Sequence, residues 1–308
     1  MRIVFMGTPD FAVSSLEALV SAGHEVCGVF SQPDKPVGRH QNKLKPTPVK
    51  ECAQTHGIPV YQPVSLRDGT AYELLKELAP ELIVVVAYGR VLPQEILDLP
   101  KYGCINVHAS LLPAYRGSAP INWAVVNGDK ETGNTIMHMA LELDAGDIIA
   151  QNRIPIDPDE CVETVHDRLA QSGGELLIKV IEDIEAGTAV RTPQDPALVT
   201  YAPMLSRQLS PIDWNLSARE IHNKVRGLNP WPATSTDIFG GEPVKVFVTA
   251  VTGESTGKAP GSVLAAGKAG IDVACGDGNV LRILELQAPG SRRMAAAAYL
   301  AGHPIAIS

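Results

Sequence analysis

The sequence predicts an α/β protein with an open, mostly parallel sheet over residues 1–189 and a small β-barrel over residues 208–308. In the first part, apolar runs alternate with amphipathic stretches, which is typical of parallel strands covered by helices. The run 82–87 is apolar throughout, as expected for a strand buried on both faces. In the last third, one amphipathic helix precedes several short strand-like runs, and this pattern favours a small barrel.

The elements of the first part follow from its apolar pattern. Strands are expected at 3–6, 26–30, 60–61, 82–87, 105–108 and 135–141. Helices are expected near 11–20, 47–55, 72–78, 118–127 and 162–186. Residues 190–207 are expected to be a linker, because the stretch 192–196 carries two prolines and cannot form regular structure.

The second part begins with a helix whose start is marked in the sequence. Ser217 and Glu220 match a capping box. Apolar side chains at helical spacing form the expected buried stripe: Ala218, Ile221, Val225 and Leu228. Strand-like runs follow at 244–251, 262–265, 271–274 and 280–286. A helix with short antiparallel strands is compatible with an oligonucleotide-binding (OB-like) barrel.

Length and composition are those of an ordinary folded protein. The 308 residues are 45 % hydrophobic, and no stretch approaches the ~20 apolar residues that span a bilayer. No signal peptide precedes the first strand, so a cytoplasmic protein without a membrane partner is expected. The five cysteines contain no C-x-x-C pair, which argues against a disulfide framework and against a zinc site.

The net charge of −8 is unevenly distributed. Residues 1–189 hold 15 basic and 25 acidic residues, a net charge of −10, whereas residues 190–308 hold 11 and 9, a net charge of +2. The segment 35–50 contains five basic residues and no acidic one. A basic segment on an acidic body indicates electrostatic steering toward a polyanion, and the alternative is a solvated surface loop.

A dinucleotide-binding motif is incomplete after the first expected strand. Such a motif needs G-x-G-x-x-G. The segment Gly7-Thr8-Pro9 has a single glycine, and its proline lacks the N–H that would face a phosphate. The sequence therefore predicts a tight turn here, and a nicotinamide-dependent oxidoreductase is disfavoured.

Asn106 and His108 form a polar pair on an otherwise apolar strand. Alternate residues of a strand share a face, so the two side chains point the same way, about 7 Å apart. A Pro- and Gly-bearing loop, residues 110–117, follows directly. Ligands of open α/β sheets bind beyond the carboxyl ends of strands, so this pair is a candidate active site. The alternative is a buried pair with satisfied hydrogen bonds.

Asp144 stands before a glycine turn in the segment 143–147. An aspartate there commonly stabilises the turn. Its functional reading is a carboxylate that orients a histidine and favours the charged imidazole. A metal site made of His108, His138 and Asp144 has no supporting ligand spacing, so no metal is expected.

Together these segments resemble the methionyl-tRNA formyltransferases over nearly the whole chain. The matching stretches are 4–12, 32–36, 84–89, 103–108, 110–113, 116–117, 143–147 and 229–232. The Asn-x-His, Ser-Leu-Leu-Pro and Asp-x-Gly-Asp set is shared by formyl-folate-dependent transferases in general. The basic segment and the Asn-Pro-Trp-Pro stretch narrow the resemblance to the tRNA enzymes.

The resemblance implies a Rossmann-like catalytic domain and formyl transfer from 10-formyltetrahydrofolate to the amino group of initiator methionyl-tRNA, without a metal. The catalytic residues it implies are Asn106, His108 and Asp144. The folate-binding residues it implies are Ser110, Leu111, Leu112 and Pro113. The tRNA-binding residues it implies are Arg39, Lys43 and Lys45, with either Arg39 or Lys43 as the key cation. The second domain is expected to hold the tRNA body, and the protein is expected to be a monomer.

Two further functions stay open at this point. One keeps the fold and the folate but uses an amino sugar or another small amine as acceptor. The other is a non-catalytic RNA-binding module, in which Asn106, His108 and Asp144 would not meet in space.

Overall fold

The computed structural model describes residues 1–37 and 43–307, which form two compact units. The first unit comprises residues 1–117, 132–154 and 166–202. The second comprises residues 118–131, 155–165 and everything from residue 203 onward. Two segments within 1–189 thus pack with the second unit, and the boundaries at 189 and 208 stay a prediction.

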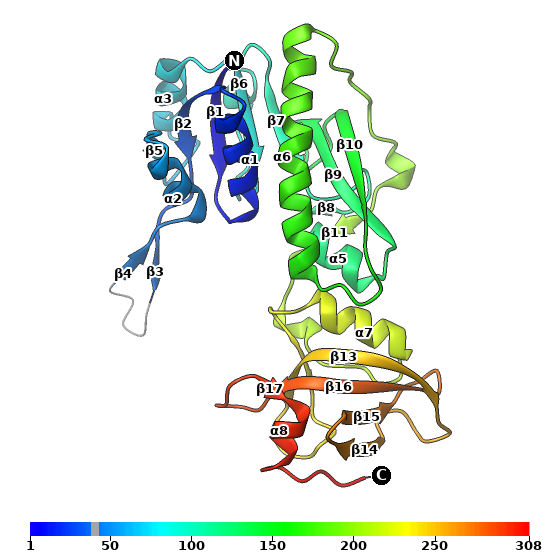
Figure 1. The fold of residues 1–308 in the computed structure, drawn as a ribbon. Coiled ribbons are helices and arrows are strands. Elements are labelled where there is room, and N and C mark those ends of the chain that lie inside the picture. Colours follow the sequence, from blue (N-terminus) through cyan, green and yellow to red (C-terminus); the bar gives the residue numbers. More distant parts are fainter. Residues whose placement is uncertain (38–42, 308) are drawn as a thin grey trace. The chain divides into compact units, whose positions relative to one another are not determined.

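A seven-stranded sheet forms the centre of the first unit (Figure 1). Its strands, in spatial order, are β10 (Ile148–Pro155), β9 (Glu131–His138), β7 (Cys104–His108), β6 (Leu82–Val86), β1 (Arg2–Gly7), β2 (Glu25–Phe30) and β5 (Val60–Tyr61). The five strands from β7 to β5 are parallel, and β9 runs antiparallel to β7. The chain passes from β1 first to β2 and later to β6, so the order reverses beside β1. Open α/β sheets bind ligands at such a reversal, beyond the carboxyl ends of the strands.

Alternate residues of the central strands face two different layers. Val4, Met6, Ile83 and Val85 belong to a core that also includes residues of α3 (Thr70–Leu78) and α4 (Gln94–Leu97). All five residues of β6 are buried, which confirms the strand predicted from the apolar run. The fold class predicted for this part is therefore confirmed.

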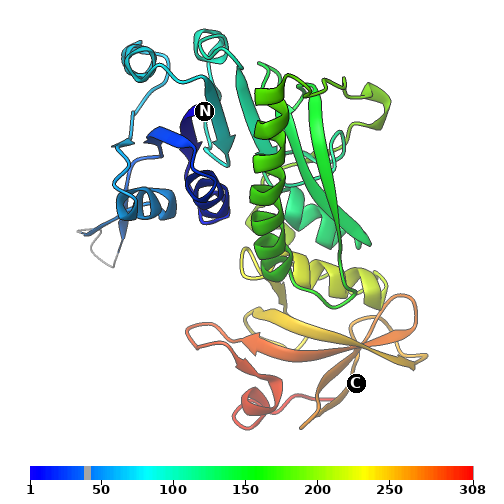
Figure 2. The ribbon, with the colours of Figure 1, turned by 45° about the horizontal axis from the view of Figure 1, so that its top comes forward.

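Helices α1 (Phe11–Ser21), α2 (Pro48–Thr55) and α6 (Val162–Ala186) form a second layer, on the face of the sheet opposite α3 and α4 (Figure 2). A Cβ on Gly174 of α6 would lie 3.0 Å from the Ser14 carbonyl of α1, so the absence of a side chain lets these helices pack closely. Thr47 caps α2 by accepting a hydrogen bond from the Lys50 N–H at 3.2 Å, and Pro48 stands at the first helical position.

The second unit is built on an antiparallel sheet packed with helices, so the antiparallel β domain predicted for the last third of the chain is confirmed. Its sheet contains β12 (Thr234–Thr236), β13 (Val244–Ser255), β16 (Asn279–Gln287), β15 (Gly270–Ala274) and β14 (Val263–Gly267), and β17 (Met294–Ala295) pairs with β16. Helix α7 (Ala218–Gly227) starts with the predicted capping box. Its apolar stripe packs on the sheet together with α8 (Ala296–Leu300).

Some elements had no clear signal in the sequence. The strand β10 was not predicted, since its exposed residues outnumber its buried ones. The segment 190–207 contains the short strand β11 (Tyr201–Ala202), which pairs with β8 (Arg116–Gly117).

Helix α5 (Pro120–Val126) lies against α7, where the Asn122 side-chain amide donates to the Gly227 carbonyl at 2.8 Å. Within the described part of the chain, no helix is long and apolar enough to cross a membrane.

Candidate active site

The site begins at the carboxyl end of β7, where the strand changes from apolar to polar. Cys104 is buried in the core, Asn106 is half-buried, and His108 is buried at the end of the strand. Val107 faces α6, where its Cγ1 would lie 3.2 Å from a Cβ on Gly173. Asn106 and His108 therefore share the opposite face of the sheet.

Asp144 reaches His108 from a separate segment. Its Oδ2 lies 3.8 Å from His108 Nδ1, and both side chains are largely buried. This distance is too long for a direct hydrogen bond between the two groups. The structure thus brings together two residues that stand 36 positions apart in the sequence.

The other nitrogen of His108 is held by the backbone. Its Nε2 lies 2.9 Å from the carbonyl oxygen of Tyr115. A carbonyl oxygen can only accept, so Nε2 donates and carries a proton. The nitrogen that faces Asp144 is therefore Nδ1.

Strained backbone and two glycines hold the Asp144 carboxylate in place. The Gly117 N–H donates to Asp144 Oδ2 at 2.8 Å. Gly117 has a φ of +120°, and a Cβ there would lie 2.7 Å from the Ala202 carbonyl oxygen. Asp144 itself has a φ of +50°, and a Cβ on Gly146 would overlap the His138 carbonyl. Such conformations cost free energy and concentrate at functional sites.

Gln194 ties this loop to Arg116. Its Nε2 donates to the carbonyl oxygens of Asp144 at 2.8 Å and Gly146 at 2.9 Å, and its Oε1 accepts from Arg116 Nε and Nη2 at 3.1 and 2.9 Å. Arg116 Nη1 also pairs with Glu142 at 3.0 Å. Sequence reasoning missed Gln194, because a lone glutamine in an expected linker has no distinguishing pattern.

Asn106 lies between Val85 on β6 and Met137 on β9. Within residues 1–37 and 43–307, no group forms a hydrogen bond with the side-chain amide of Asn106. Because the side chain is half-buried and unpaired in this range, its N–H and C=O remain available to a ligand.

The loop 110–113 after β7 is held by hydrogen bonds to neighbouring residues. The Ser110 hydroxyl donates to the Ala114 carbonyl at 2.7 Å. Thr135 on β9 donates to the Ser110 carbonyl at 2.6 Å and accepts from the Leu112 N–H at 3.0 Å. Leu112 is buried, whereas Leu111 and Pro113 are partly exposed.

The loops after β1, β2 and β6 are joined by hydrogen bonds at the reversal point of the sheet. The carbonyl oxygen of Tyr88 accepts from the Thr8 hydroxyl at 3.0 Å and from the Gln32 amide at 3.1 Å. Arg90 Nε donates to Gln32 Oε1 at 3.1 Å. The Gly7-Thr8-Pro9 segment is thus a turn that is held by a hydrogen bond from Thr8.

Part of the basic segment lies within the described residues. Lys43 and Lys45 bound β4 (Lys43–Lys45), which pairs with β3 (Lys35–Val37), and the Lys45 side chain is exposed. Arg39 lies outside the described residues. Lys50 lies 2.7 Å from Asp34, and this ammonium group lowers the pKa of the Asp34 carboxyl.

His138 does not join a metal-binding group with His108 and Asp144 in the part of the chain that the structure describes. Burial is the main factor that lowers the pKa of His138, and the nearby Arg191 acts in the same direction. Both effects favour the neutral imidazole.

The family model described as "Formyl transferase" matches residues 1–181, and "Formyl transferase, C-terminal domain" matches residues 204–304. The methionyl-tRNA formyltransferase of Moorella thermoacetica is 52 % identical over 305 residues, covering 99 % of this chain and 97 % of that protein. That of Trichlorobacter lovleyi is 48 % identical over 306 residues, covering 99 % and 95 %.

A solved structure shares the fold at low sequence identity. It is an N-formyltransferase from Helicobacter canadensis in complex with folinic acid and dTDP-3-aminofucose, with a TM-score of 0.70 and 20 % identity over 92 % of this chain and 98 % of that one. The fold agrees with both family matches, and the identity to the curated relatives extends over both domains. The chain therefore belongs to the methionyl-tRNA formyltransferase family.

Proposed function

We propose that this enzyme transfers the formyl group of 10-formyltetrahydrofolate to the amino group of methionine on initiator tRNA. The observation that carries the proposal is the meeting of His108 and Asp144 at 3.8 Å beside the unpaired amide of Asn106, at the carboxyl end of β7. This arrangement offers a hydrogen-bond donor, a titratable nitrogen and a carboxylate to one reacting group.

The reaction needs a donor for the formyl oxygen. The amine attacks the formyl carbon, and negative charge develops on the oxygen as the tetrahedral intermediate forms. The Asn106 N–H and a protonated His108 Nδ1 would donate to that oxygen. Preorganised donors of this kind stabilise a transition state by about 2.7–4 kcal/mol each.

Collapse of the intermediate breaks the bond between the formyl carbon and N10 of the folate. The attacking nitrogen loses a proton, and N10 gains one. His108 Nδ1 can exchange a proton because the Tyr115 carbonyl occupies only Nε2. Asp144 would balance the positive charge of the imidazolium. Formyl-folate is already an activated donor, so the step needs no covalent enzyme intermediate.

The folate would lie against the loop 110–113. The Ser110 hydroxyl and the Leu112 N–H are bonded within the protein, so the loop would present the partly exposed Leu111 and Pro113 to the pterin ring. The solved N-formyltransferase from Helicobacter canadensis contains folinic acid, which supports a formyl-folate as the donor.

The tRNA would contact Arg39, Lys43 and Lys45 in the basic segment, and its body would contact the second domain. Lys45 is exposed, and it forms no ion pair with a described residue. We expect the enzyme to act in the cytoplasm as a monomer, which sedimentation of the purified protein would measure.

The acceptor assay tests this function. Purified enzyme is incubated with radiolabelled 10-formyltetrahydrofolate and either methionyl-tRNA, a nucleotide-linked amino sugar or free methionine. We expect label on methionyl-tRNA at a rate at least 100-fold above the other acceptors. Faster labelling of the amino sugar would instead favour a sugar formyltransferase. Absence of transfer to any acceptor, with formyl-folate unbound, would indicate a non-catalytic RNA-binding protein.

A further inference from the structure

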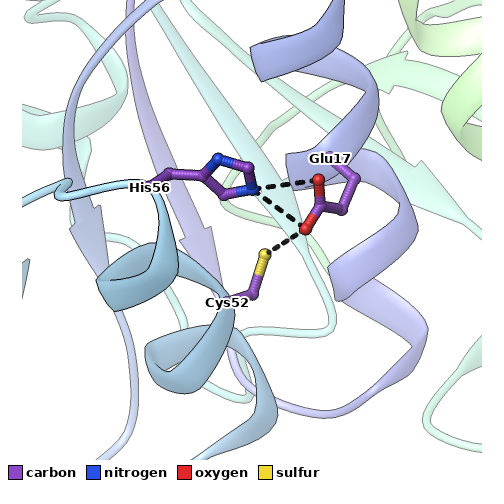
Figure 3. A group of neighbouring side chains, drawn as sticks. All are labelled: Glu17, Cys52 and His56. Carbon is purple, nitrogen blue, oxygen red and sulfur yellow. Dashed lines mark hydrogen bonds and ion pairs between the residues drawn. The ribbon is translucent and has the colours of Figure 1, made fainter.

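A cluster of three metal-ligating side chains joins α1 and α2 (Figure 3), and none of its members belongs to the candidate active site. Glu17 lies on α1 and Cys52 lies on α2, and His56 is the C-cap residue of α2. The Cys52 Sγ lies 3.1 Å from Glu17 Oε1, and His56 Nε2 lies 3.0 Å from both carboxylate oxygens. One ligand atom of each residue lies within 4.8 Å of the other two.

The local structure explains why these side chains converge. Cys52 and His56 are four residues apart, so they project from the same side of α2. Glu17 stands in the second half of α1 and faces them. Cys52 is buried, whereas Glu17 and His56 retain 45 % and 31 % of their side-chain exposure. The cluster is therefore closed on the thiol side and open to ions on the other.

We propose that Glu17, Cys52 and His56 bind one Zn²⁺ ion, with water as the fourth ligand. Thiolate, imidazole and carboxylate are the groups that bind zinc in proteins. Tetrahedral ligands at about 2.0–2.3 Å from zinc lie roughly 3.3–3.8 Å apart. The separations of 3.0 and 3.1 Å in the cluster therefore require only a small outward movement.

Charge and ligand softness select the ion. A thiolate and a carboxylate together neutralise a divalent cation beside a neutral imidazole. Mg²⁺ and Ca²⁺ prefer oxygen ligands, so the sulfur and nitrogen donors select zinc over them. Without metal, burial and the neighbouring Glu17 raise the pKa of the Cys52 thiol to about 12. The bound ion replaces this thiol proton, which is released to solvent.

The ion would link α1 to α2, the helix that begins at the end of the basic segment. Zn²⁺ bound to Glu17 and to Cys52 would fix α1 against α2, and α2 starts three residues after β4. The role is structural, since none of the three residues belongs to the candidate active site. The spacing along the chain does not reveal it, because Glu17 is distant in sequence from the other two.

Metal binding by the full-length protein tests the site. Protein freed of metal with a chelator is titrated with Zn²⁺ against a competing chromogenic chelator, and separately with Co²⁺. We expect one Zn²⁺ per chain, a near-ultraviolet band from thiolate-to-cobalt charge transfer, and a melting temperature that rises with Zn²⁺. No saturable binding, or a cobalt spectrum without the thiolate band, would overturn the proposal.

Variants show whether this cluster is the binding site. Glu17→Gln, Cys52→Ser and His56→Ala should each weaken Zn²⁺ binding by more than the roughly 10- to 100-fold typical of outer-shell partners. Cys161→Ser and His24→Gln remove the same residue types elsewhere and should bind zinc as the wild type does. Glu17 and His56 are partly exposed, so those variants keep the test valid if Cys52→Ser unfolds. Wild-type affinity in all three cluster variants would mean that zinc binds elsewhere.

Discussion

Asn106 and His108 share one face of β7 but differ in how firmly the protein holds them. The Asn106 side chain has no hydrogen-bonding partner among the described residues, whereas the His108 side chain donates to the Tyr115 carbonyl. We predict that Asn106→Ala and His108→Ala each lower kcat by about 10²- to 10³-fold, because each removes a donor to the developing oxyanion. Single-turnover formyl transfer to methionyl-tRNA measures the effect.

The stabilities of these two variants should differ. We expect Asn106→Ala to leave the melting temperature unchanged, whereas His108→Ala removes a buried hydrogen bond to the Tyr115 carbonyl and lowers the unfolding free energy by about 1–3 kcal/mol. The affinity for folate is the control, and we expect it to stay unchanged in both variants. An Asn106→Ala enzyme with the wild-type rate would contradict the role given to the amide.

Gln194 bonds the backbone of the loop that carries Asp144, so we expect it to affect the reaction only by positioning Asp144. Gln194→Met keeps the length of the side chain and removes its bonds to the Asp144 and Gly146 carbonyls. We predict that kcat falls by about 10- to 100-fold because the carboxylate is misplaced, while KM for folate stays within about two-fold. Steady-state kinetics measure both, and Gln171→Met on the exposed face of α6 is the matched control. A loss of stability with an unchanged kcat would show that Gln194 is purely structural.

Among the elements, α7 carries a buried titratable group. His222 is 4 % exposed, its Nδ1 lies 2.9 Å from the Thr249 hydroxyl, and its Nε2 lies 3.2 Å from Asp159. Burial lowers the pKa of His222, and this effect exceeds the opposing attraction of Asp159. Arg219 and Arg226 also lower this pKa. Between pH ~6.5 and the lowered pKa of the folded state, the unfolded chain therefore binds a proton that the folded chain excludes.

The stabilising effect of His222 is fully present above pH ~6.5 and is lost as the pH falls toward the lowered folded pKa. We predict that the melting temperature of the wild type falls more between pH 7 and pH 5 than that of His222→Gln, which can still bond Thr249. Calorimetry of both proteins over this range measures the difference. Equal slopes would contradict the assignment.

At the scale of the whole molecule, the distribution of charge bears on tRNA binding. A net charge of −8 opposes binding to a polyanion, so we expect the local basic segment to supply the attraction. We predict that tRNA affinity falls as salt rises, with a slope of log K against log salt of about −0.7 to −0.9 per phosphate contact. Affinity that is independent of salt would contradict the role of the segment.

Variants of the basic segment refine this prediction. Arg39→Ala and Lys45→Ala should weaken tRNA binding and reduce the salt slope, with folate binding unchanged. Lys76→Ala is the matched control, because Lys76 is an exposed lysine of α3 paired with Glu73. A filter-binding titration over several salt concentrations compares all four proteins. Equal loss of affinity in Lys76→Ala would indicate a general charge effect.

Much of the fold could be predicted because buried strands and helices show an apolar pattern in neighbouring residues of the sequence. The uniformly apolar β6 and the capping box of α7 are both read from neighbouring residues, and both are present. The strand β10 and the pairing of β8 with β11 could not be predicted, because short or largely exposed strands lack an apolar pattern.

The residues proposed for catalysis were recognisable individually, but their supports were not. Asn106 and His108 were conspicuous as polar residues on an apolar strand. Tyr115 holds His108 through a backbone carbonyl, and Gln194 acts through hydrogen bonds across the loop. Groups of this kind have no signature in composition or spacing.

The sequence by itself determined which segments become buried strands and capped helices, since these depend on the periodicity and chemistry of adjacent residues. The folded structure decided which distant side chains meet: Asp144 with His108, Gln194 with Arg116, and Glu17 with Cys52 and His56. The reason is that such meetings depend on chain reversals and packing, which no local pattern records.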